Sequence, residues 1–194
     1  MERKTEFKRQ TKETHVWGEI NLHGSGVAKI ETGIGFLDHM LELFTFHSGI
    51  DLTLTCKGDL EVCVHHSVED IALTLGESIH KVLQGAVGIR RYATCFLPMD
   101  ETLTRTVVDV SGRPFYLLHG KFEYEKIGEL PTEMISHFFK SLCVAGKITL
   151  HQEIIYGGND HHRAESLFKG FARALSEAVQ LTGSNQVPST KGVL

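Results

Sequence analysis

The sequence is poor in the residues that crosslink or interrupt small proteins. Its 194 residues include four prolines, one tryptophan and four cysteines, which are Cys56, Cys63, Cys95 and Cys143. No two cysteines have the Cys-x-x-Cys spacing of redox motifs and many zinc sites. Most of them lie in apolar runs, so we expect buried free thiols, as in proteins of a reducing compartment.

Long apolar runs and an excess of positive charge are also absent. No apolar run approaches the roughly 20 residues that a membrane-spanning helix needs. The segment 1–13 is charged throughout and lacks the apolar core of a signal peptide. A net charge of −4 argues against general binding of nucleic acids. We therefore expect a cytoplasmic protein without a nucleic-acid or membrane partner, long enough for one domain or two small halves.

Histidine, in contrast, is abundant, with 12 residues, and several of them form a repeated motif. His65-His66-Ser67-Val68-Glu69 and His161-His162-Arg163-Ala164-Glu165 share the pattern His-His-x-x-Glu. Each copy opens a run with helical apolar spacing, over 68–83 and 164–181. Positions i and i+4 of a helix lie on the same face, so the first histidine and the glutamate of each copy can bind one ion.

The second histidine of each pair is displaced by about 100° around the helix and points elsewhere. One helix start can therefore contribute to two metal centres. A single His-His pair is more often a solvated helix end, but two copies with the same spacing favour metal binding. Imidazole with carboxylate suits a divalent ion such as Mn, Fe, Co, Ni or Zn, and the spacing differs from that of zinc proteases.

The periodicity of apolar residues predicts the order of strands and helices. Strands are expected at 7–22, 27–30, 51–56, 60–64, 92–98, 102–110, 115–122 and 147–155, with 27–30 and 60–64 as the returning strands of hairpins. Helices are expected at 36–44, 68–85, 131–145 and 164–181.

The two halves of this pattern have the same order. In each half, strands are followed by a helix that contains a histidine, then a strand region, then the His-His-x-x-Glu helix. His39 precedes His65 by 26 residues, and His137 precedes His161 by 24. We infer an internal duplication, with pseudo-symmetric halves at about 1–88 and 89–194 that pack as one domain through their sheets or helices.

Six ordered segments carry a resemblance to a known family. They are TGIGFLDHML (32–41), HHSVED (65–70), PMDE (98–101), SGRP (111–114), NDHH (159–162) and PSTKGV (188–193). With these segments the chain resembles the imidazoleglycerol-phosphate dehydratases over nearly its whole length. Family members usually have two aspartates just before the first His-His pair, where this chain has Cys63 and Val64. Such acids can support metal ligands from outside the coordination sphere.

The resemblance implies a hydro-lyase that converts D-erythro-imidazoleglycerol phosphate to imidazoleacetol phosphate and water in L-histidine biosynthesis. It implies a duplicated α/β fold of the ribosomal protein S5 domain 2-like type, in which each half is a β-sheet with two helices on one face. It also implies two Mn²⁺ per active site and self-association into a shell of 24 subunits.

The duplication supplies eight candidate metal ligands, in two sets of three histidines and one glutamate. The first set is His39, His66, His161 and Glu165. The second set is His65, Glu69, His137 and His162. Each set leaves coordination positions open for substrate, as a catalytic centre requires. His47 and His151 have no counterpart in the other half, so we interpret them as structural or supporting residues.

The resemblance also implies a set of substrate-binding positions: Glu13, His39, His65, Glu69, Arg91, Arg113, His161, Lys169, Ser189, Thr190 and Lys191. Arginine can bind phosphate oxygens through paired N–H donors. Alternatively, Arg113 merely follows a turn. The tail 189–191 has the composition of a mobile segment and would become ordered over bound phosphate.

The carbon that loses the hydrogen in this dehydration is not next to a carbonyl group, so the reaction cannot proceed through an enolate. Two ions beside the imidazole ring can stabilise an imidazolate, which can expel the adjacent hydroxyl to give a diazafulvene. A base then removes the neighbouring C–H proton. Glu13 is the candidate base, and Glu69 and Glu165 are less free alternatives. The same residues would also suit a metal-dependent hydrolase or a metal-storage shell, which an assay of dehydration would separate.

Overall fold

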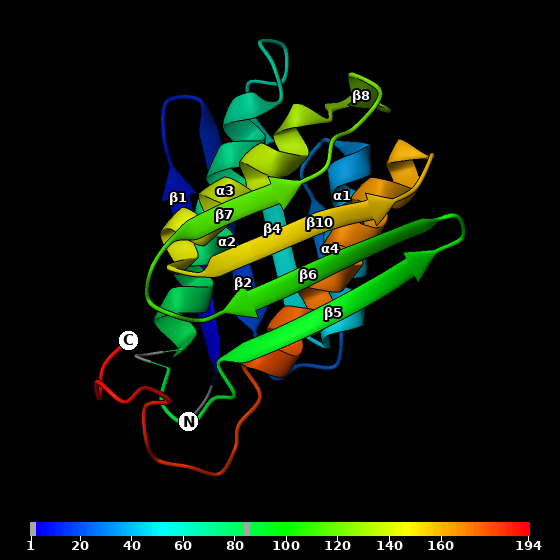
Figure 1. Ribbon diagram of the computed structural model, residues 1–194. Helices are drawn as coiled ribbons and strands as arrows, with labels where there is room; N and C mark the ends of the chain where they lie inside the picture. Colours follow the sequence, from blue (N-terminus) through cyan, green and yellow to red (C-terminus); the bar gives the residue numbers. More distant parts are fainter. Residues whose placement is uncertain (1–2, 84–85) are drawn as a thin grey trace.

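The computed structural model describes residues 3–83 and 86–194, which form two halves of the same design (Figure 1). The first half contains β1 (Lys4–Gln10), β2 (Thr14–Asn21), β3 (Ala28–Glu31), α1 (Gly35–Ser48), β4 (Asp51–Gly58) and α2 (His65–Leu83). The second contains β5 (Tyr92–Met99), β6 (Thr102–Asp109), β7 (Phe115–His119), β8 (Lys126–Ile127), β9 (Leu130–Pro131), α3 (Glu133–Gly146), β10 (Thr149–Tyr156) and α4 (Asp160–Ala178).

The strand order shows the duplication directly. One four-stranded sheet has the order β1-β2-β4-β3, and the other has the equivalent order β5-β6-β10-β7. In each sheet the last pair is parallel and the other pairs are antiparallel. The short strands β8 and β9 form a separate hairpin in the second half, which has no counterpart among the described residues of the first half.

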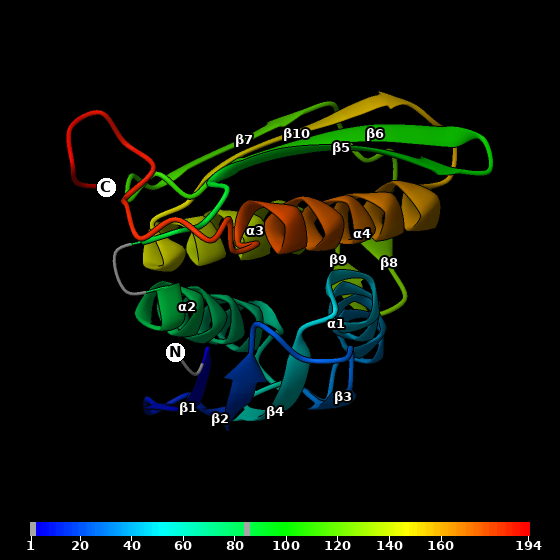
Figure 2. The ribbon, with the colours of Figure 1, turned by 90° about the horizontal axis from the view of Figure 1, so that it is seen from below.

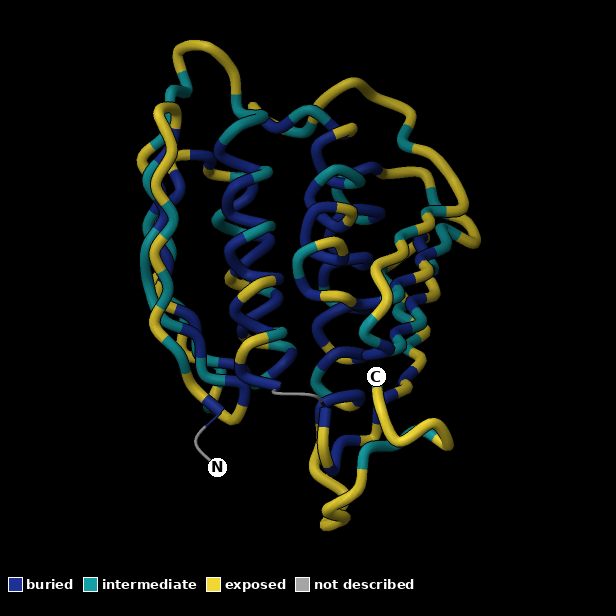
Figure 3. The backbone as a smooth tube through the Cα atoms, turned by 90° about the vertical axis from the view of Figure 1, so that its left-hand side faces the viewer, coloured by how far each residue is buried: buried dark blue, intermediate teal, exposed yellow. Residues whose placement is uncertain are grey.

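The two halves meet through their helices. Figure 2 shows the four helices between the two sheets, with α2 beside α3 and α1 beside α4. Buried residues lie mainly on the helices and the inner faces of the strands (Figure 3). The rings of Phe44 on α1 and Phe171 on α4 stack at 5.7 Å across the junction. Burying an aromatic side chain of this kind stabilises the fold by about 1.5–3 kcal/mol.

A glycine allows a close approach between the halves. A Cβ atom at Gly76 of α2 would collide with the backbone of Leu142 and Gly146 on α3. Because glycine lacks that atom, the two helices can pack backbone against backbone. This contact fixes the relative position of α2 and α3, which carry one of the histidine clusters described below.

The predicted α/β class, the two helices on one face of each sheet and most elements are confirmed. The strand predicted at 60–64 is wrong, because β4 already pairs with β2 on one edge and β3 on the other. The hairpin predicted for 27–30 is also wrong. Instead, β3 pairs in parallel with β4. Helix α1 connects the two strands, as is usual for a crossover between parallel strands.

Other predicted boundaries shift by a few residues. The single strand predicted at 7–22 is two antiparallel strands, β1 and β2, which begin at Lys4 and are separated by a turn. Pro131 lies in β9, and α3 begins at Glu133. Helices α2 and α4 begin at His65 and Asp160, so both histidine pairs are part of the helices. The predicted end of α2 at residue 85 lies outside the described residues.

The cysteines differ in part from expectation, since Cys56 and Cys143 are buried but Cys63 is exposed and Cys95 is half-buried. Cys63 lies in the turn that replaces the strand predicted at 60–64, which explains its exposure. Within the described residues, no helix combines the length and the apolar character needed to cross a membrane.

Candidate metal centres and substrate site

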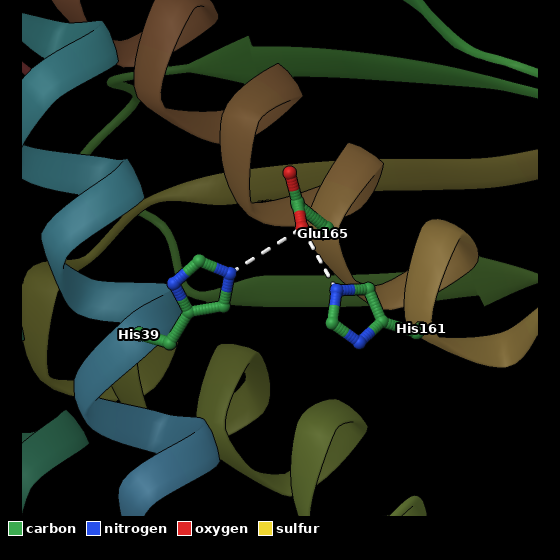
Figure 4. Close-up of side chains that lie close together, drawn as sticks. All are labelled: His39, His161 and Glu165. Carbon is green, nitrogen blue, oxygen red and sulfur yellow. Dashed lines mark hydrogen bonds and ion pairs between the residues drawn. The ribbon is translucent and has the colours of Figure 1, made fainter.

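One histidine cluster joins α1 to the first turns of α4 (Figure 4). His39 comes from α1, and His161 and Glu165 come from α4. The Oε2 atom of Glu165 lies 3.0 Å from Nε2 of His161 and 3.5 Å from Nε2 of His39. The Glu165 side chain is only 8 % exposed. Two imidazoles and one carboxylate therefore converge on a single point.

A second cluster joins α2 to α3 in the equivalent way. His65 and Glu69 lie at the start of α2, and His137 lies on α3. The Oε2 atom of Glu69 is 3.9 Å from Nε2 of His65, and its Oε1 atom is 3.6 Å from Nε2 of His137. The two imidazole rings are 4.5 Å apart. The ligand atoms of each cluster all lie within 4.8 Å of one another.

Each cluster combines residues from both halves. This crossing follows from the packing, because α1 contacts α4 and α2 contacts α3. The start of α4 is fixed by local hydrogen bonds: the side chain of Asn159 caps the helix by accepting the N–H of His161 at 2.9 Å. Asp160 accepts the backbone N–H groups of Glu123 and Tyr124 and pairs with Arg163.

The residues fit a divalent cation. Imidazole nitrogen and carboxylate oxygen are suitable donors for a borderline transition metal. The Nε2 atom of His137 is buried and has no hydrogen-bond partner among the described residues, which is costly unless a ligand uses its lone pair. A cation bound between His65, Glu69 and His137 would satisfy that atom.

Lys169 lies one helical turn beyond Glu165 and contacts its other carboxylate oxygen, Oε1. Burial acts to raise the pKa of Glu165, but hydrogen bonds from Lys169 and His161 outweigh it and lower the pKa. The carboxylate is therefore ionised at neutral pH. The structure brings Lys169, a predicted substrate-binding residue, to the edge of the first cluster.

The second histidine of each pair lies outside both clusters. Nδ1 of His66 is 3.1 Å from Asp59 Oδ2, and its Nε2 is 3.9 Å from Glu13 Oε1. Nδ1 of His162 is 2.7 Å from Glu101 Oε2. Within one chain, the structure thus brings together three of the four residues in each predicted set, and leaves His66 and His162 apart.

Carboxylates beside these histidines were missed as functional candidates. Asp59 lies between the strands predicted at 51–56 and 60–64, and Glu101 belongs to the resembling segment 98–101. The hydrogen bond from His162, with that from the Asn159 N–H, holds the pKa of Glu101 far below its usual range. In the sequence, the only sign of a role for Asp59 and Glu101 is that Asp59 follows a strand and Glu101 lies in a hairpin turn. Only the tertiary structure shows that both turns lie beside a histidine.

The predicted phosphate-binding residues gather elsewhere. Arg91 is 8 % exposed, and it donates from Nε to Asp109 and from Nη1 to the backbone oxygen of Pro188, both at 2.8 Å. Nη2 of Arg113 lies 4.0 Å from Oδ2 of the same Asp109 carboxylate, but the Arg113 side chain is 67 % exposed. The tail turns back on itself here, with the N–H of Lys191 bonded to the hydroxyl of Ser189. Thr190 lies in the same turn.

This group of predicted phosphate-binding residues lies at the opposite end of α4 from the cluster of His39, His161 and Glu165. The N–H of Arg91 bonds to the oxygen of Ala178 at the last turn of α4, whereas His161 lies in the first turn. At 1.5 Å per residue, the 19 residues of α4 span roughly 28 Å. In Figure 1 the tail and the start of α4 lie at opposite ends of this helix.

Two further histidines stay outside the clusters. His47 lies in the last turn of α1, and the pKa of its ring is lowered by burial and by Lys169 and Arg173. His151 is on β10, where its ring lies 5.3 Å from that of Phe115. Neither residue is among the groups that could hold an ion.

Comparison with known proteins now defines the family. The model of the family described as imidazoleglycerol-phosphate dehydratase matches residues 32–175, which include both clusters. The chain belongs to the imidazoleglycerol-phosphate dehydratase family. An imidazoleglycerol-phosphate dehydratase of Clostridium botulinum (strain Alaska E43 / Type E3) is 54 % identical over 188 residues, which cover 97 % of this chain and 96 % of the relative.

Solved structures of imidazoleglycerol-phosphate dehydratases share the fold. That of Staphylococcus aureus is similar with a TM-score of 0.82 and 38 % identity, and the match covers 92 % of this chain and 99 % of the other. That of Pyrococcus furiosus, in complex with (S)-C348, has a TM-score of 0.84 and 34 % identity, covering 97 % and 100 %. The predicted resemblance and the predicted duplicated fold are confirmed.

Proposed function

We propose that this member of the imidazoleglycerol-phosphate dehydratase family converts D-erythro-imidazoleglycerol phosphate to imidazoleacetol phosphate and water, a step of L-histidine biosynthesis. The observation that carries the proposal is the pair of crossed His-His-Glu clusters in a chain of this family. Each cluster would hold one Mn²⁺, so that two ions serve each active site.

Each active site is shared between copies of the chain. The roughly 28 Å between the start of α4 and the phosphate-binding group is much longer than a substrate with one imidazole ring, three chain carbons and one phosphate. A single copy therefore cannot bind both ends of the substrate. The phosphate would be bound by Arg91, Arg113 and Lys191 of one copy while the ring lies at metal centres of others.

The same sharing completes the metal centres. Each cluster supplies three ligands from one chain, and the predicted sets contain a fourth, His66 or His162. These two histidines are not members of their own chain's two His-His-Glu clusters, so they could complete the centres of neighbouring copies. A shell in which metal centres lie between subunits follows, in agreement with the 24 subunits implied by the resemblance.

When bound, two divalent ions would stabilise the imidazolate form of the substrate ring, which makes expulsion of the adjacent hydroxyl possible. The protein residues then orient the substrate and move one proton. Glu13 is more than half exposed beside His66, so its carboxylate is free to accept the C–H proton from the neighbouring carbon. The ring proton and the expelled hydroxide leave as water, the C–H proton returns to the ring nitrogen, and the resulting enol tautomerises to the ketone.

Glu69 and Glu165 are less suited to act as the base. Glu165 is buried and already bonded to His161 and Lys169. Glu69 lies between His65 and His137. Their carboxylate oxygens are directed into the clusters, where they would offset cationic charge.

The test is an assay of the purified full-length protein with imidazoleglycerol phosphate, after chelation and again after addition of Mn²⁺. Formation of the ketone only in the presence of metal is the expected result. Release of inorganic phosphate without the ketone would instead identify a metal-dependent hydrolase. Full metal loading without any turnover would indicate a storage shell. Either of these two outcomes would overturn the proposal.

A further inference from the structure

His66 and His162 are each held by a carboxylate on the Nδ1 side of the ring. Both oxygens of Asp59 lie within 3.2 Å of Nδ1 of His66, at 3.1 and 3.2 Å. Oε2 of Glu101 lies 2.7 Å from Nδ1 of His162. An ionised carboxylate can only accept a hydrogen bond, so the ring proton must be on Nδ1. The lone pair of a neutral ring is then on Nε2.

These carboxylates are themselves fixed in position. The second oxygen of Glu101 accepts the N–H groups of Gly158 and Asn159 at 3.2 and 2.9 Å, and the hydroxyl of Thr102 at 2.9 Å. Glu101 therefore connects the β5–β6 turn to the start of α4. Asp59 is held through its backbone, which donates to Glu13 and accepts from Val62.

The arrangement is repeated in the two halves. Neither Nε2 atom has a hydrogen bond among the described residues, and each has an acidic side chain 3.9 Å away, Glu13 in one half and Asp100 in the other. Glu13 lies in the turn between β1 and β2, and Asp100 lies in the equivalent turn between β5 and β6. A free Nε2 beside an acid thus occurs twice.

The residues that bind Nδ1 are not equivalent by sequence. Asp59 follows β4, whereas Glu101 precedes β6. The same contact is therefore made from different positions in the two halves. Duplication alone would have placed both carboxylates at equivalent positions, so the repeated contact points to a functional requirement. Cys63 is exposed and Val64 is apolar, so neither can replace the acids that relatives usually have before the first histidine pair.

We propose that Asp59 and Glu101 are positioning residues that keep the proton on Nδ1 of His66 and His162 and direct Nε2 outward as a metal ligand. The inference rests on the proposed function, since it takes these histidines as ligands. Hydrogen bonds of this kind fix the tautomer and increase the basicity of the ligand, and their loss typically weakens metal binding about 10–100-fold.

The experiment compares Mn²⁺ affinity, measured by competition with a chelator, in the full-length protein and four variants: Asp59→Asn, Asp59→Ala, Glu101→Gln and Glu101→Ala. Each alanine variant should bind one of its two ions per chain about 10–100-fold more weakly and the other normally. The amide variants should lose less, because an amide oxygen can still accept from Nδ1–H. Glu61→Gln, an exposed residue of the same turn as Asp59, is the matched control and should bind normally.

A spectroscopic measurement separates positioning from folding. The ¹⁵N chemical shifts of His66 in metal-free protein should report Nδ1–H in the native chain and in Glu61→Gln, and a shift toward the Nε2–H tautomer in Asp59→Ala. Native affinity for both ions in the alanine variants, or an unchanged tautomer, would overturn the proposal. If one alanine variant fails to fold, the Mn²⁺ affinity of the alanine variant in the other half decides.

Failure of the proposed function would look different. A native protein that binds two ions but does not dehydrate the substrate would contradict the function and leave the positioning of His66 and His162 intact. Active protein whose metal affinity is insensitive to Asp59 and Glu101 would contradict only the positioning.

Discussion

Nε2 of His39 lies 3.5 Å from Oε2 of Glu165, although the two residues belong to opposite halves of the chain. The equivalent pair, His137 and Glu69, lies at 3.6 Å with the halves exchanged. The duplication therefore produces two similar centres, and each needs both halves. Neither half would retain a complete cluster without the other, which couples the packing of the four helices to the chemistry of the site.

The phosphate-binding assignment predicts a defect in substrate binding without loss of metal. Arg113→Ala and Lys191→Ala should each weaken substrate binding by roughly 1.5–3 kcal/mol, the value of a hydrogen bond to a charged group, or about one to two orders of magnitude in affinity. Steady-state kinetics and metal analysis on the same samples measure both effects. Lys121→Ala, another exposed lysine, is the control, and depleted Mn in either test variant would refute the assignment.

Arg91→Ala should behave differently from Arg113→Ala. The Arg91 guanidinium is buried and bonded to Asp109 and Pro188. Its removal leaves the half-buried Asp109 carboxylate with only the long 4.0 Å contact to exposed Arg113. Breaking a buried pair in this way typically costs about 3–5 kcal/mol. Thermal unfolding should therefore show a lower Tm for Arg91→Ala and a nearly native Tm for Arg113→Ala. Equal Tm values would show that the Arg91–Asp109 pair does not contribute to stability.

The sharing of sites predicts complementation between inactive variants. Glu165→Gln removes a metal ligand, and the double variant Arg113→Ala with Lys191→Ala removes phosphate contacts. Each preparation alone should have little activity. When the two are stripped of metal, mixed and reassembled with Mn²⁺, some sites combine an intact metal centre from one copy with an intact phosphate-binding group from another. Activity above the sum of the separate preparations is expected, and simple additivity would mean that each site lies within one chain.

Metal should also control the size of the particle. The proposed sharing of each centre between copies means that the binding energy of the metal would stabilise the assembled state. Chelator-treated protein should sediment as smaller species and return to a large particle when Mn²⁺ is added. A large particle that persists after complete removal of metal would show that assembly depends on other contacts.

The four thiols should differ in reactivity. Burial raises the pKa of Cys143 to about 12 and also raises that of Cys56, and the thiolate is the reactive form. Timed alkylation near pH 8, followed by peptide mass spectrometry, should modify exposed Cys63 first and leave Cys56 and Cys143 unmodified. Unfolded protein, in which all four react, is the control. Rapid labelling of Cys143 in folded protein would contradict the packing of α3.

Much of the fold could be predicted because it depends on local periodicity. The helices around His39, His137 and the two histidine pairs have clear 3.6-residue spacing, and the repeated order of elements indicated the duplication. The stretch 60–64 has the same alternation as a strand, yet β4 had no free edge for it. Pairing partners are a tertiary property, so periodicity alone could not exclude that strand.

The grouping of the clustered histidines and glutamates could be predicted from the internal duplication of the sequence. The repeated His-His-x-x-Glu pattern, preceded by a histidine in each half, predicted a ligand set that contains His39, His161 and Glu165. The contacts of His66 with Asp59 and of His162 with Glu101 could not be inferred, because they depend on how two turns fold against the starts of α2 and α4. The distance from Arg91 to the metal centres likewise follows only from the orientation of α4.

The most direct test of the account is to count metal ions in Glu69→Gln and Glu165→Gln. Each change removes the only carboxylate of one cluster and leaves the other cluster complete, and the lost negative charge no longer offsets that of the ion. We predict two bound ions per chain in the native protein, one in each single variant and nearly complete loss of turnover in both, because the chemistry needs both ions. The double variant should lose both ions and be little slower still, since groups that act as a unit are not additive. Two ions retained by either single variant, with activity alone lost, would make that glutamate a free base and contradict the two crossed centres.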